Sequence, residues 1–178
     1  MPARISKALV ARLARVKLFL CDVDGVLTNG TVTLGEGREF KSFNIQDGLG
    51  LLFLKRNGIQ VGWISNRPSQ VTQQRAAELK IDFLFQEDVS KVQAVENILR
   101  QTAFKWEEIC YMGDDVVDLG VLQRAGAGIA VANGVQEVRR CAHYVTQAKG
   151  GEGAVREVVE MILVAQKKWG QLVQGYLA

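Results

Sequence analysis

The chain is poor in the residues that build the commonest zinc sites and histidine-based catalytic centres. Of its 178 residues one is a histidine, His143, and three are cysteines, at positions 21, 110 and 141. The cysteine count is odd and the spacing matches no zinc motif. We therefore expect neither a histidine-based triad nor a zinc centre, and we predict that His143 is structural. Two cysteines lie in apolar, strand-like runs, which predicts reduced core residues in a cytoplasmic protein.

Long apolar runs and clustered charge are missing as well. No apolar run approaches the ~18–20 residues of a membrane span, and no apolar signal-peptide core with a small-residue cleavage site is expected. The net charge of +3 is dispersed, whereas nucleic-acid binding needs clustered lysine and arginine. We expect no nucleic-acid and no membrane partner. The basic stretch 4–17 predicts the solvated face of an N-terminal helix within 1–15, with a membrane or targeting role as the alternative.

Short apolar runs alternate regularly with amphipathic segments. The length of 178 residues suits one domain with a full core, which we expect over residues 1–178. The pattern predicts strands at 17–21, 60–64, 82–85, 109–112, 128–131 and 143–145, and helices at 47–57, 69–79, 90–102, 115–125, 135–140 and 152–168. This order predicts an α/β fold with a doubly wound, mostly parallel, Rossmann-like sheet flanked by helices.

One segment interrupts the alternation. Residues 30–43 alternate polar and apolar side chains around a Gly-Glu-Gly turn at 35–37, which predicts a β-hairpin insertion. The next helix is expected to start near Asp47, so there is no room for a separate cap domain. We expect the apolar tail 169–178 to be an ordered arm that covers another surface.

Polar side chains suited to phosphate chemistry follow four of the predicted strands. In chain order they are Asp22 and Asp24; Ser65, Asn66 and Arg67; Lys91; and Asp114, Asp115 and Asp118. The carboxyl ends of parallel strands share one edge of a sheet, so these groups can converge there. Several carboxylates in one place repel each other unless a cation lies among them, and oxygen ligands suit Mg²⁺. A carboxylate can attack phosphorus, a second can transfer protons, and a lysine can stabilise the transferring phosphoryl group.

The four groups in this order resemble the motifs of the haloacid dehalogenase-like phosphohydrolases, over about residues 16 to 165. The resemblance implies that Asp22 is the nucleophile and Asp24 the general acid–base. It also implies a Mg²⁺ site made by the Asp22 carboxylate, the Asp24 backbone carbonyl and the Asp114 carboxylate.

The remaining motif residues receive their roles from the same resemblance. Ser65 and Lys91 would bind the transferring phosphoryl group. Asp115 and Asp118 would be supporting residues, with Asp115 near the metal or orienting Lys91. An acid near a helix start is also a common N-terminal cap, which is the alternative for both aspartates.

Two further stretches, FNIQDGLG at 43–50 and GGEGAVREV at 150–158, resemble a capless subgroup of this family. That subgroup dephosphorylates 3-deoxy-D-manno-octulosonate 8-phosphate, a lipopolysaccharide precursor. The resemblance implies a homotetramer in which the hairpin contributes to assembly and a neighbouring subunit helps to close each site. The substrate contacts that it implies are Phe43, Asn44, Ile45, Gln46, Asp47, Asn66, Arg67 and Arg75, beside Asp24, Ser65 and Lys91.

The sequence departs from the subgroup at several positions. Asn29 stands where aspartate is usual, Asn66 replaces a glycine, and Leu52 replaces an expected basic residue, which removes one potential anion contact. Arg67 favours the eight-carbon substrate over nine-carbon, sialic-acid-like ulosonate 9-phosphates, whose phosphatases tend to carry glutamate there. The alternatives are such a nine-carbon substrate, another small phosphate ester, or a non-catalytic assembly subunit.

Overall fold

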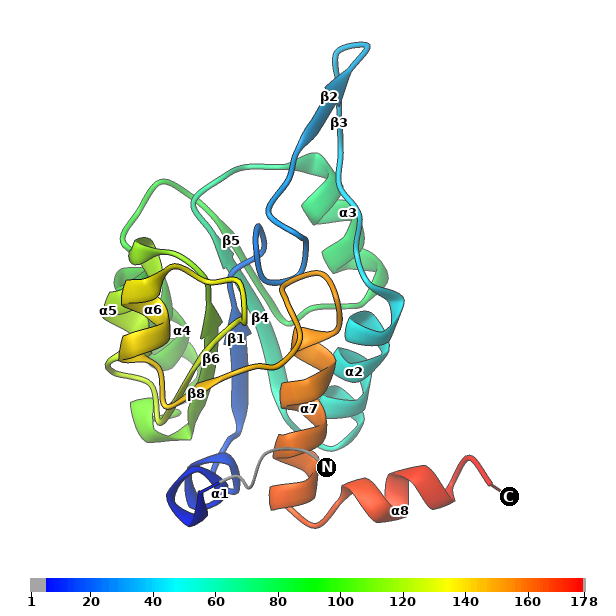
Figure 1. Ribbon diagram of the computed structural model, residues 1–178, viewed down its shortest axis with the longest axis vertical. Coiled ribbons are helices and arrows are strands. Elements are labelled where there is room, and N and C mark those ends of the chain that lie inside the picture. Colours follow the sequence, from blue (N-terminus) through cyan, green and yellow to red (C-terminus); the bar gives the residue numbers. More distant parts are fainter. Residues whose placement is uncertain (1–5, 178) are drawn as a thin grey trace.

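A six-stranded sheet forms the centre of the structure, a computed structural model that describes residues 6–177 (Figure 1). The strands run in the order β5-β4-β1-β6-β7-β8, and every neighbouring pair is parallel. They are β1 Leu18–Cys21, β4 Gln60–Ser65, β5 Phe83–Gln86, β6 Ile109–Gly113, β7 Ala127–Ala130 and β8 Tyr144–Val145. The predicted α/β fold is therefore confirmed. The chain runs outward from β1 to β5 and then returns to the other side of β1, so the end of β1 is the switch point.

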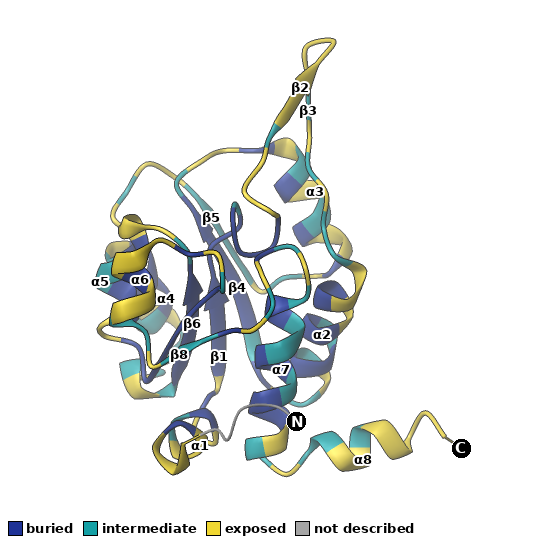
Figure 2. Ribbon diagram, viewed as in Figure 1, coloured by how far each residue is buried: buried dark blue, intermediate teal, exposed yellow. Residues whose placement is uncertain are grey.

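Helices cover both faces of the sheet because β1 is buried on both sides. Phe19 and Cys21 belong to one core cluster, and Leu18 and Leu20 belong to the other, as alternating strand residues do. The first core is covered by α1 Lys7–Leu13, α2 Ile45–Arg56, α3 Gln70–Glu78 and α7 Ala154–Ala165. The second is covered by α4 Lys91–Thr102, α5 Leu119–Leu122 and α6 Gln136–Cys141. Figure 2 shows the buried sheet between these two layers.

Three of the six helices predicted from the alternating pattern differ from the structure by two residues or more at an end. The helix expected over 115–125 is wrong: a 3₁₀ turn η2, Val116–Asp118, leads into the single-turn α5, because buried Asp118 binds the backbone that precedes it. The helix expected over 152–168 is shorter in the structure, where α7 spans Ala154–Ala165. It starts after Gly153, whose φ of 100° lies in the left-handed region. The helix expected from 47 starts at Ile45, where the Asn44 side chain caps it. A second 3₁₀ turn, η1, spans Trp106–Glu108.

The predicted hairpin is present as β2 Thr33–Gly35 and β3 Arg38–Phe40, paired antiparallel. It projects beyond the end of the sheet at which β1 terminates (Figure 1). Its outer apolar side chains are exposed, Leu34 by 75% and Phe40 by 55%. Apart from this hairpin, residues 6–177 contain no inserted domain that could cap the sheet.

The C-terminal tail forms a helix, α8 Trp169–Gln174, at the opposite end of the molecule (Figure 1). It contacts α7 and leaves the end of β1 in its own chain uncovered. Residues 1–5 of the predicted N-terminal helix and residue 178 of the tail lie outside the described range. Within that range, no helix has both the length and the apolar character needed to cross a membrane.

Candidate active site

The turn after β1 brings the first two predicted carboxylates to the switch point. The Asp22 backbone N–H donates to the Met112 carbonyl of β6 at 3.0 Å, which continues the sheet by one residue. The turn follows at Gly25, whose φ is +92°. A Cβ added at Gly25 would lie 2.0 Å from Oδ2 of Asp114, so only glycine allows that carboxylate to approach the turn.

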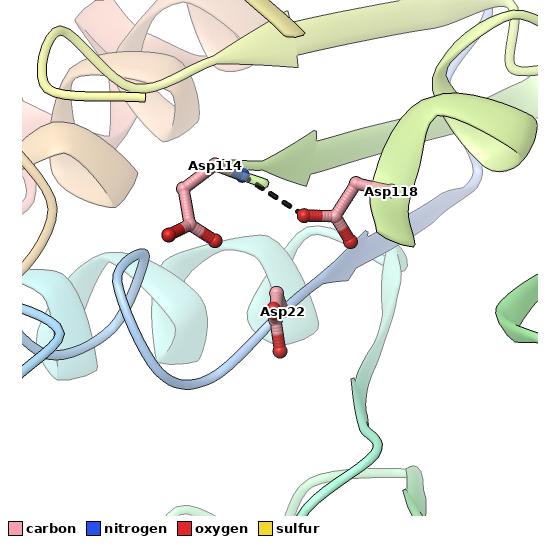
Figure 3. A group of neighbouring side chains, drawn as sticks. All are labelled: Asp22, Asp114 and Asp118. Atoms are coloured by element: carbon pink, nitrogen blue, oxygen red, sulfur yellow. Dashed lines mark hydrogen bonds between the residues drawn. The ribbon is translucent and has the colours of Figure 1, made fainter. Parts of the chain in front are cut away.

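Three carboxylates meet here, from Asp22, Asp114 and Asp118, with one oxygen of each within 4.8 Å of the others (Figure 3). Lys91, the first residue of α4, places its Nζ 2.7 Å from Asp22 Oδ2 and 2.7 Å from Asp118 Oδ1. Lys91 is itself buried. Burial opposes its charge, but the two aspartates dominate and raise the pKa of Lys91. The ammonium therefore stays charged and lies beside the predicted nucleophile.

Asp118 is fully occupied by protein donors. Its Oδ1 accepts from Lys91 and from the Tyr111 hydroxyl at 2.6 Å, and its Oδ2 accepts from the backbone N–H groups of Asp114 and Asp115 at 2.9 and 3.2 Å. Asp118 therefore positions Lys91 and the turn after β6. The predicted orientation of Lys91 by Asp115 is wrong, because exposed Asp115 caps η2 through Val116 N.

Asp114 and Asp22 fit a divalent cation. Among the described residues, Asp114 Oδ1 is buried and has no hydrogen-bond partner. Burial, followed by the charges of Asp22 and Asp118, raises the pKa of Asp114 to about 7. Burial likewise raises the pKa of Asp22 to about 6, although Lys91 opposes the shift. Carboxylates that repel each other around an unsatisfied oxygen are the donor set for Mg²⁺, and these two aspartates would hold it. The Asp24 carbonyl stays a predicted third ligand.

The second motif lies at the end of β4, which neighbours β1. Ser65 is buried, and its Oγ accepts from the Arg67 backbone N–H at 3.1 Å. The Asn66 side-chain amide donates to the backbone carbonyls of Val89 at 2.8 Å and Glu87 at 3.3 Å. Asn66 therefore ties this loop to the one that leads into Lys91. Its NH₂ group is taken by the protein, so its position does not support the predicted substrate contact.

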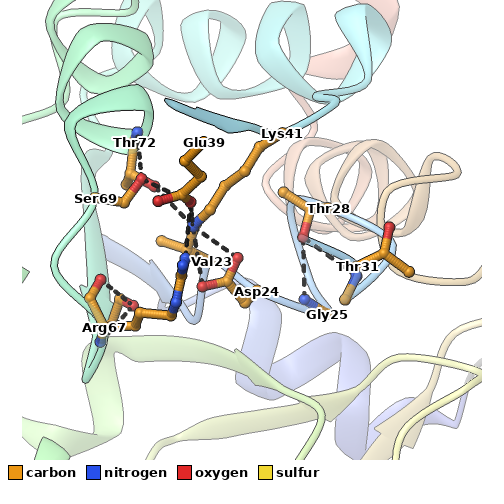
Figure 4. A network of polar contacts seen from close by, with 12 residues as sticks. Val23, Asp24, Gly25, Thr28, Thr31, Glu39, Lys41, Arg67, Ser69 and Thr72 are labelled. Atoms are coloured by element: carbon orange, nitrogen blue, oxygen red, sulfur yellow. Dashed lines mark hydrogen bonds and ion pairs between the residues drawn. The ribbon is translucent and has the colours of Figure 1, made fainter. Parts of the chain in front are cut away.

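A second polar network surrounds Asp24 (Figure 4). The Lys41 Nζ lies 2.7 Å from Asp24 Oδ1 and 3.0 Å from Oδ2. It also donates to Thr72 Oγ1 of α3 at 3.2 Å and lies 3.4 Å from Glu39 Oε1. The Lys41 side chain has no exposed surface. The predicted general acid–base is thus paired with a buried ammonium that comes from the segment after β3.

Glu39 of β3 joins the hairpin to the second motif. Its Oε1 lies 2.7 Å from Arg67 Nη1 and accepts from the Ser69 hydroxyl at 3.2 Å. The hydrogen bond from Arg67 is the main reason that the pKa of Glu39 is lowered. The Arg67 side chain is still 44% exposed, so its guanidinium can reach an anion in solution.

Sequence reasoning missed Glu39, Lys41 and Tyr111. The signal for the first two was the strand period: residues two apart share a face, so Glu39 and Lys41 point together while Phe40 points away. Tyr111 lies inside an apolar strand, and only the fold shows that its hydroxyl meets Asp118.

The segment at the start of α2 divides into structural and exposed residues. Asp47 is buried and accepts from the Arg156 backbone N–H at 2.7 Å, which caps the start of α7. The predicted sugar contact by Asp47 is therefore not supported. Asn44 caps α2, whereas the side chains of Ile45 and Gln46 are exposed.

Phe43 and Arg75 lie together on the side of α2 and α3. The Phe43 ring stacks on Trp63 at 6.3 Å between centroids, and the Arg75 guanidinium lies 6.0 Å from the Phe43 centroid. Arg75 Nη1 also pairs with Glu78 Oε2 at 2.8 Å. Leu52 packs against the core and faces no anion site. The sugar contacts of Phe43 and Arg75 stay predictions.

The loop at 150–151 packs directly against the turn after β1. Gly151 N donates to the Val26 carbonyl at 2.9 Å. A Cβ added at Gly150 would lie 1.7 Å from the Gly25 carbonyl oxygen, so a side chain there would displace the turn that carries the aspartates. The geometry of the site thus depends on segments more than a hundred residues apart in the sequence.

Comparisons with known proteins agree with this geometry. A family profile described as haloacid dehalogenase-like hydrolase matches residues 64–158. The 3-deoxy-D-manno-octulosonate 8-phosphate phosphatase of Yersinia pestis is 38% identical over 92% of this chain and 88% of its own length.

Two solved structures share the fold closely. The first is the phosphatase of that name from Moraxella catarrhalis, in complex with a magnesium ion, a phosphate ion and 3-deoxy-D-manno-octulosonate. It has a TM-score of 0.92 and 37% identity, and covers 94% of this chain and 97% of its own. The second is the cobalt-bound enzyme from Haemophilus influenzae, with a TM-score of 0.89 and 36% identity, covering 94% of this chain and 99% of its own.

Proposed function

The chain belongs to the haloacid dehalogenase-like hydrolases and is a phosphatase, and we propose that its substrate is 3-deoxy-D-manno-octulosonate 8-phosphate. The products are the free sugar acid and phosphate, and the cofactor is Mg²⁺. The observation that carries the chemistry is Asp22 held 2.7 Å from Lys91, beside an unpartnered oxygen of Asp114. The named activity of the relatives supports the substrate, and through it a role in lipopolysaccharide precursor synthesis.

The reaction proceeds in two steps on this arrangement. Asp22 attacks phosphorus, the bond to the sugar oxygen breaks, and Asp24 gives that oxygen its proton, leaving an aspartyl-phosphate. Asp24 then takes a proton from a water that attacks the phosphoryl group, which releases phosphate and restores Asp22. Lys91 and Ser65 bind the phosphoryl oxygens throughout. Bound Mg²⁺ supplies positive charge against the nucleophile and the phosphate.

Arg67 supports the choice of an acidic sugar. It lies in the loop after Ser65, its guanidinium is partly exposed, and a guanidinium recognises a carboxylate through paired hydrogen bonds. The test compares phosphate release, with Mg²⁺, from the eight-carbon 8-phosphate and a nine-carbon ulosonate 9-phosphate. We expect kcat/KM to favour the first by about tenfold or more, which corresponds to about 1.4 kcal/mol. A preference for the nine-carbon ester, or none, would reject this substrate but keep the phosphatase.

The alternative of a non-catalytic assembly subunit receives less support, since both carboxylates after β1 are in place and each is paired with a lysine. We do propose that the chain assembles as a homotetramer whose neighbouring subunits complete each site. The exposed apolar side chains of Leu34 and Phe40 on the hairpin and Leu177 after α8 support such contacts. The cytoplasmic location stays a prediction.

A further inference from the structure

Each of the two carboxylates after β1 has its own buried ammonium. Lys91 pairs with Asp22 and has a side chain that is 2% exposed, and Lys41 pairs with Asp24 and has one that is 0% exposed. The first pair belongs to the motifs that identify the family, whereas Lys41 lies between β3 and α2. A buried charge is costly unless it is paired with an opposite charge, so the charged form of Lys41 is stabilised by the carboxylates beside it, and it stabilises their charged forms in turn.

The contacts of Lys41 are directional. Its Nζ donates a hydrogen bond to Asp24 Oδ2 at 3.0 Å and lies 2.7 Å from Oδ1 as an ion pair, so one ammonium restrains the rotation of that carboxylate. The ammonium also donates a hydrogen bond to Thr72 Oγ1 at 3.2 Å and lies 3.4 Å from Glu39 Oε1. Figure 4 shows these side chains converging from the turn after β1, the hairpin arm and α3. The hairpin thereby reaches the reacting groups within its own chain.

We propose that Lys41 is a positioning residue that holds the Asp24 carboxylate in the orientation needed for proton transfer. This inference rests on the proposed function, because it requires Asp24 to act as the general acid–base. Proton transfer demands a donor within hydrogen-bond reach of the leaving oxygen, and a carboxylate free to rotate meets that demand for only part of the time. Lys41 acts through Asp24, whereas phosphate binding depends on Ser65 and Lys91.

A double-mutant cycle tests the proposal. Phosphate release with Mg²⁺ is measured for wild type, Lys41→Met, Asp24→Asn and the double variant, with long incubations for the slow ones. We expect Lys41→Met to lower kcat by about tenfold or more with KM nearly unchanged, against roughly 10²–10⁴-fold for loss of the proton-transfer group itself. In the Asp24→Asn background, Lys41→Met should cause no further loss, since residues that act as one unit are not additive.

A matched control is Lys17→Met, which removes a lysine whose Nζ lies at the same 2.7 Å from a carboxylate, Glu108, but on the surface. It should leave kcat unchanged. If Lys41→Met does not fold, Thr72→Val is the second variant, because it removes one contact to the ammonium with little change of shape. A smaller loss of kcat that is seen when Asp24 is present and absent in Asp24→Asn supports the same conclusion.

Two results would overturn the inference: an unchanged kcat in Lys41→Met, or an equal fold-loss in both backgrounds, which would mean that Lys41 supports the fold alone. Wild type that releases no phosphate from any sugar phosphate is a different result, because it removes the proposed function and this inference with it. Melting temperature and oligomeric state are recorded for every variant.

Discussion

The two halves of the site around the end of β1 are built differently. The buried half consists of Asp22, the proposed nucleophile, with Lys91 and Asp118, and its members come from a strand end and from helix starts that follow strands. The outer half consists of Asp24, the proposed general acid–base, with Lys41; it contacts Glu39 of the hairpin and borders the exposed Arg67. The first half is fixed by the core of the domain, whereas the second depends on an arm that projects from it (Figure 2).

Both halves contribute to the proposed chemistry, but only the outer half lies where selectivity can be set. A buried nucleophile with its lysine has the same geometry whatever covers the site, because the sheet register sets it. The outer half is where the substrate's sugar can be contacted, since Asp24 and Arg67 keep exposed side-chain surface although Lys41 is buried. Substitutions in the buried half should therefore affect the nucleophile or the stability of the fold, whereas substitutions in the outer half should affect proton transfer and selectivity.

The largest effect is expected from Asp22→Asn, which breaks the buried half at its centre. An amide cannot attack phosphorus, so kcat should fall by at least ~10³-fold, about 4 kcal/mol of barrier. The fold should persist, because asparagine can still accept from Val23 N and the change removes one of three neighbouring carboxylates. Phosphate release and melting temperature are the measurements, and residual activity near the wild-type level would refute the assignment of the nucleophile.

Asp118→Ala should be the most destabilising substitution in the same half. It strips a partner from buried Lys91 and leaves Tyr111 and two backbone N–H groups unpaired, at a cost of about 3–5 kcal/mol. Asp115→Ala is the matched control from the same motif, and it should lose only about 1 kcal/mol as a helix-turn cap. Urea unfolding measures both. Equal losses would mean that burial does not distinguish the two aspartates.

The sequence predicted that the side chains of the buried half lie close together, because Asp22 follows β1, Lys91 and Asp118 lie near the helix starts after β5 and β6, and the carboxyl ends of parallel strands share one edge of the sheet. It missed the partners of Asp24, because Lys41 lies 17 positions away, beyond the end of β3, and the strand period indicates only that Glu39 and Lys41 share a face, not what that face contacts. The family resemblance also implied a substrate contact for Asp47, and nothing in the sequence indicates that this acid caps a different helix, α7. The sequence predicted most of the helices and strands, whereas these contacts between side chains on different elements could not be predicted from it.

Without a divalent cation, the repulsion between the carboxylates of the buried half should make the free energy of unfolding depend on pH. The pKa of Asp114 is about 7 when folded, against its usual 3.8, so the folded state binds a proton that the unfolded state has lost. The free energy of unfolding should therefore fall as the pH rises from about 4 to about 7 in chelator. Mg²⁺ offsets the crowding of the ionised carboxylates, so its stabilising effect should be greater near pH 8 than near pH 5.

Thermal unfolding with chelator and with Mg²⁺ at the two pH values measures this dependence. Asp114→Asn is the informative variant, because it keeps the side-chain shape and removes the titrating group. It should reduce the pH dependence in chelator, leaving the part that comes from the raised pKa of Asp22, and it should reduce the gain from Mg²⁺. A gain that is equal at both pH values in wild type, or unaltered in the variant, would contradict the assignment of Asp114 to the metal.

The smallest effect is expected from Asn66→Ala, at the border between the halves. The change removes hydrogen bonds to the Val89 and Glu87 carbonyls, so stability should fall by about 1 kcal/mol, with a lower urea midpoint and an unchanged slope. KM should barely change, because the amide already serves the loop before Lys91. Asn97→Ala, on the exposed face of α4, is the control and should stay within about 0.5 kcal/mol of wild type. A large rise in KM at unchanged stability would instead place Asn66 in the outer half, against the substrate, as its motif suggests.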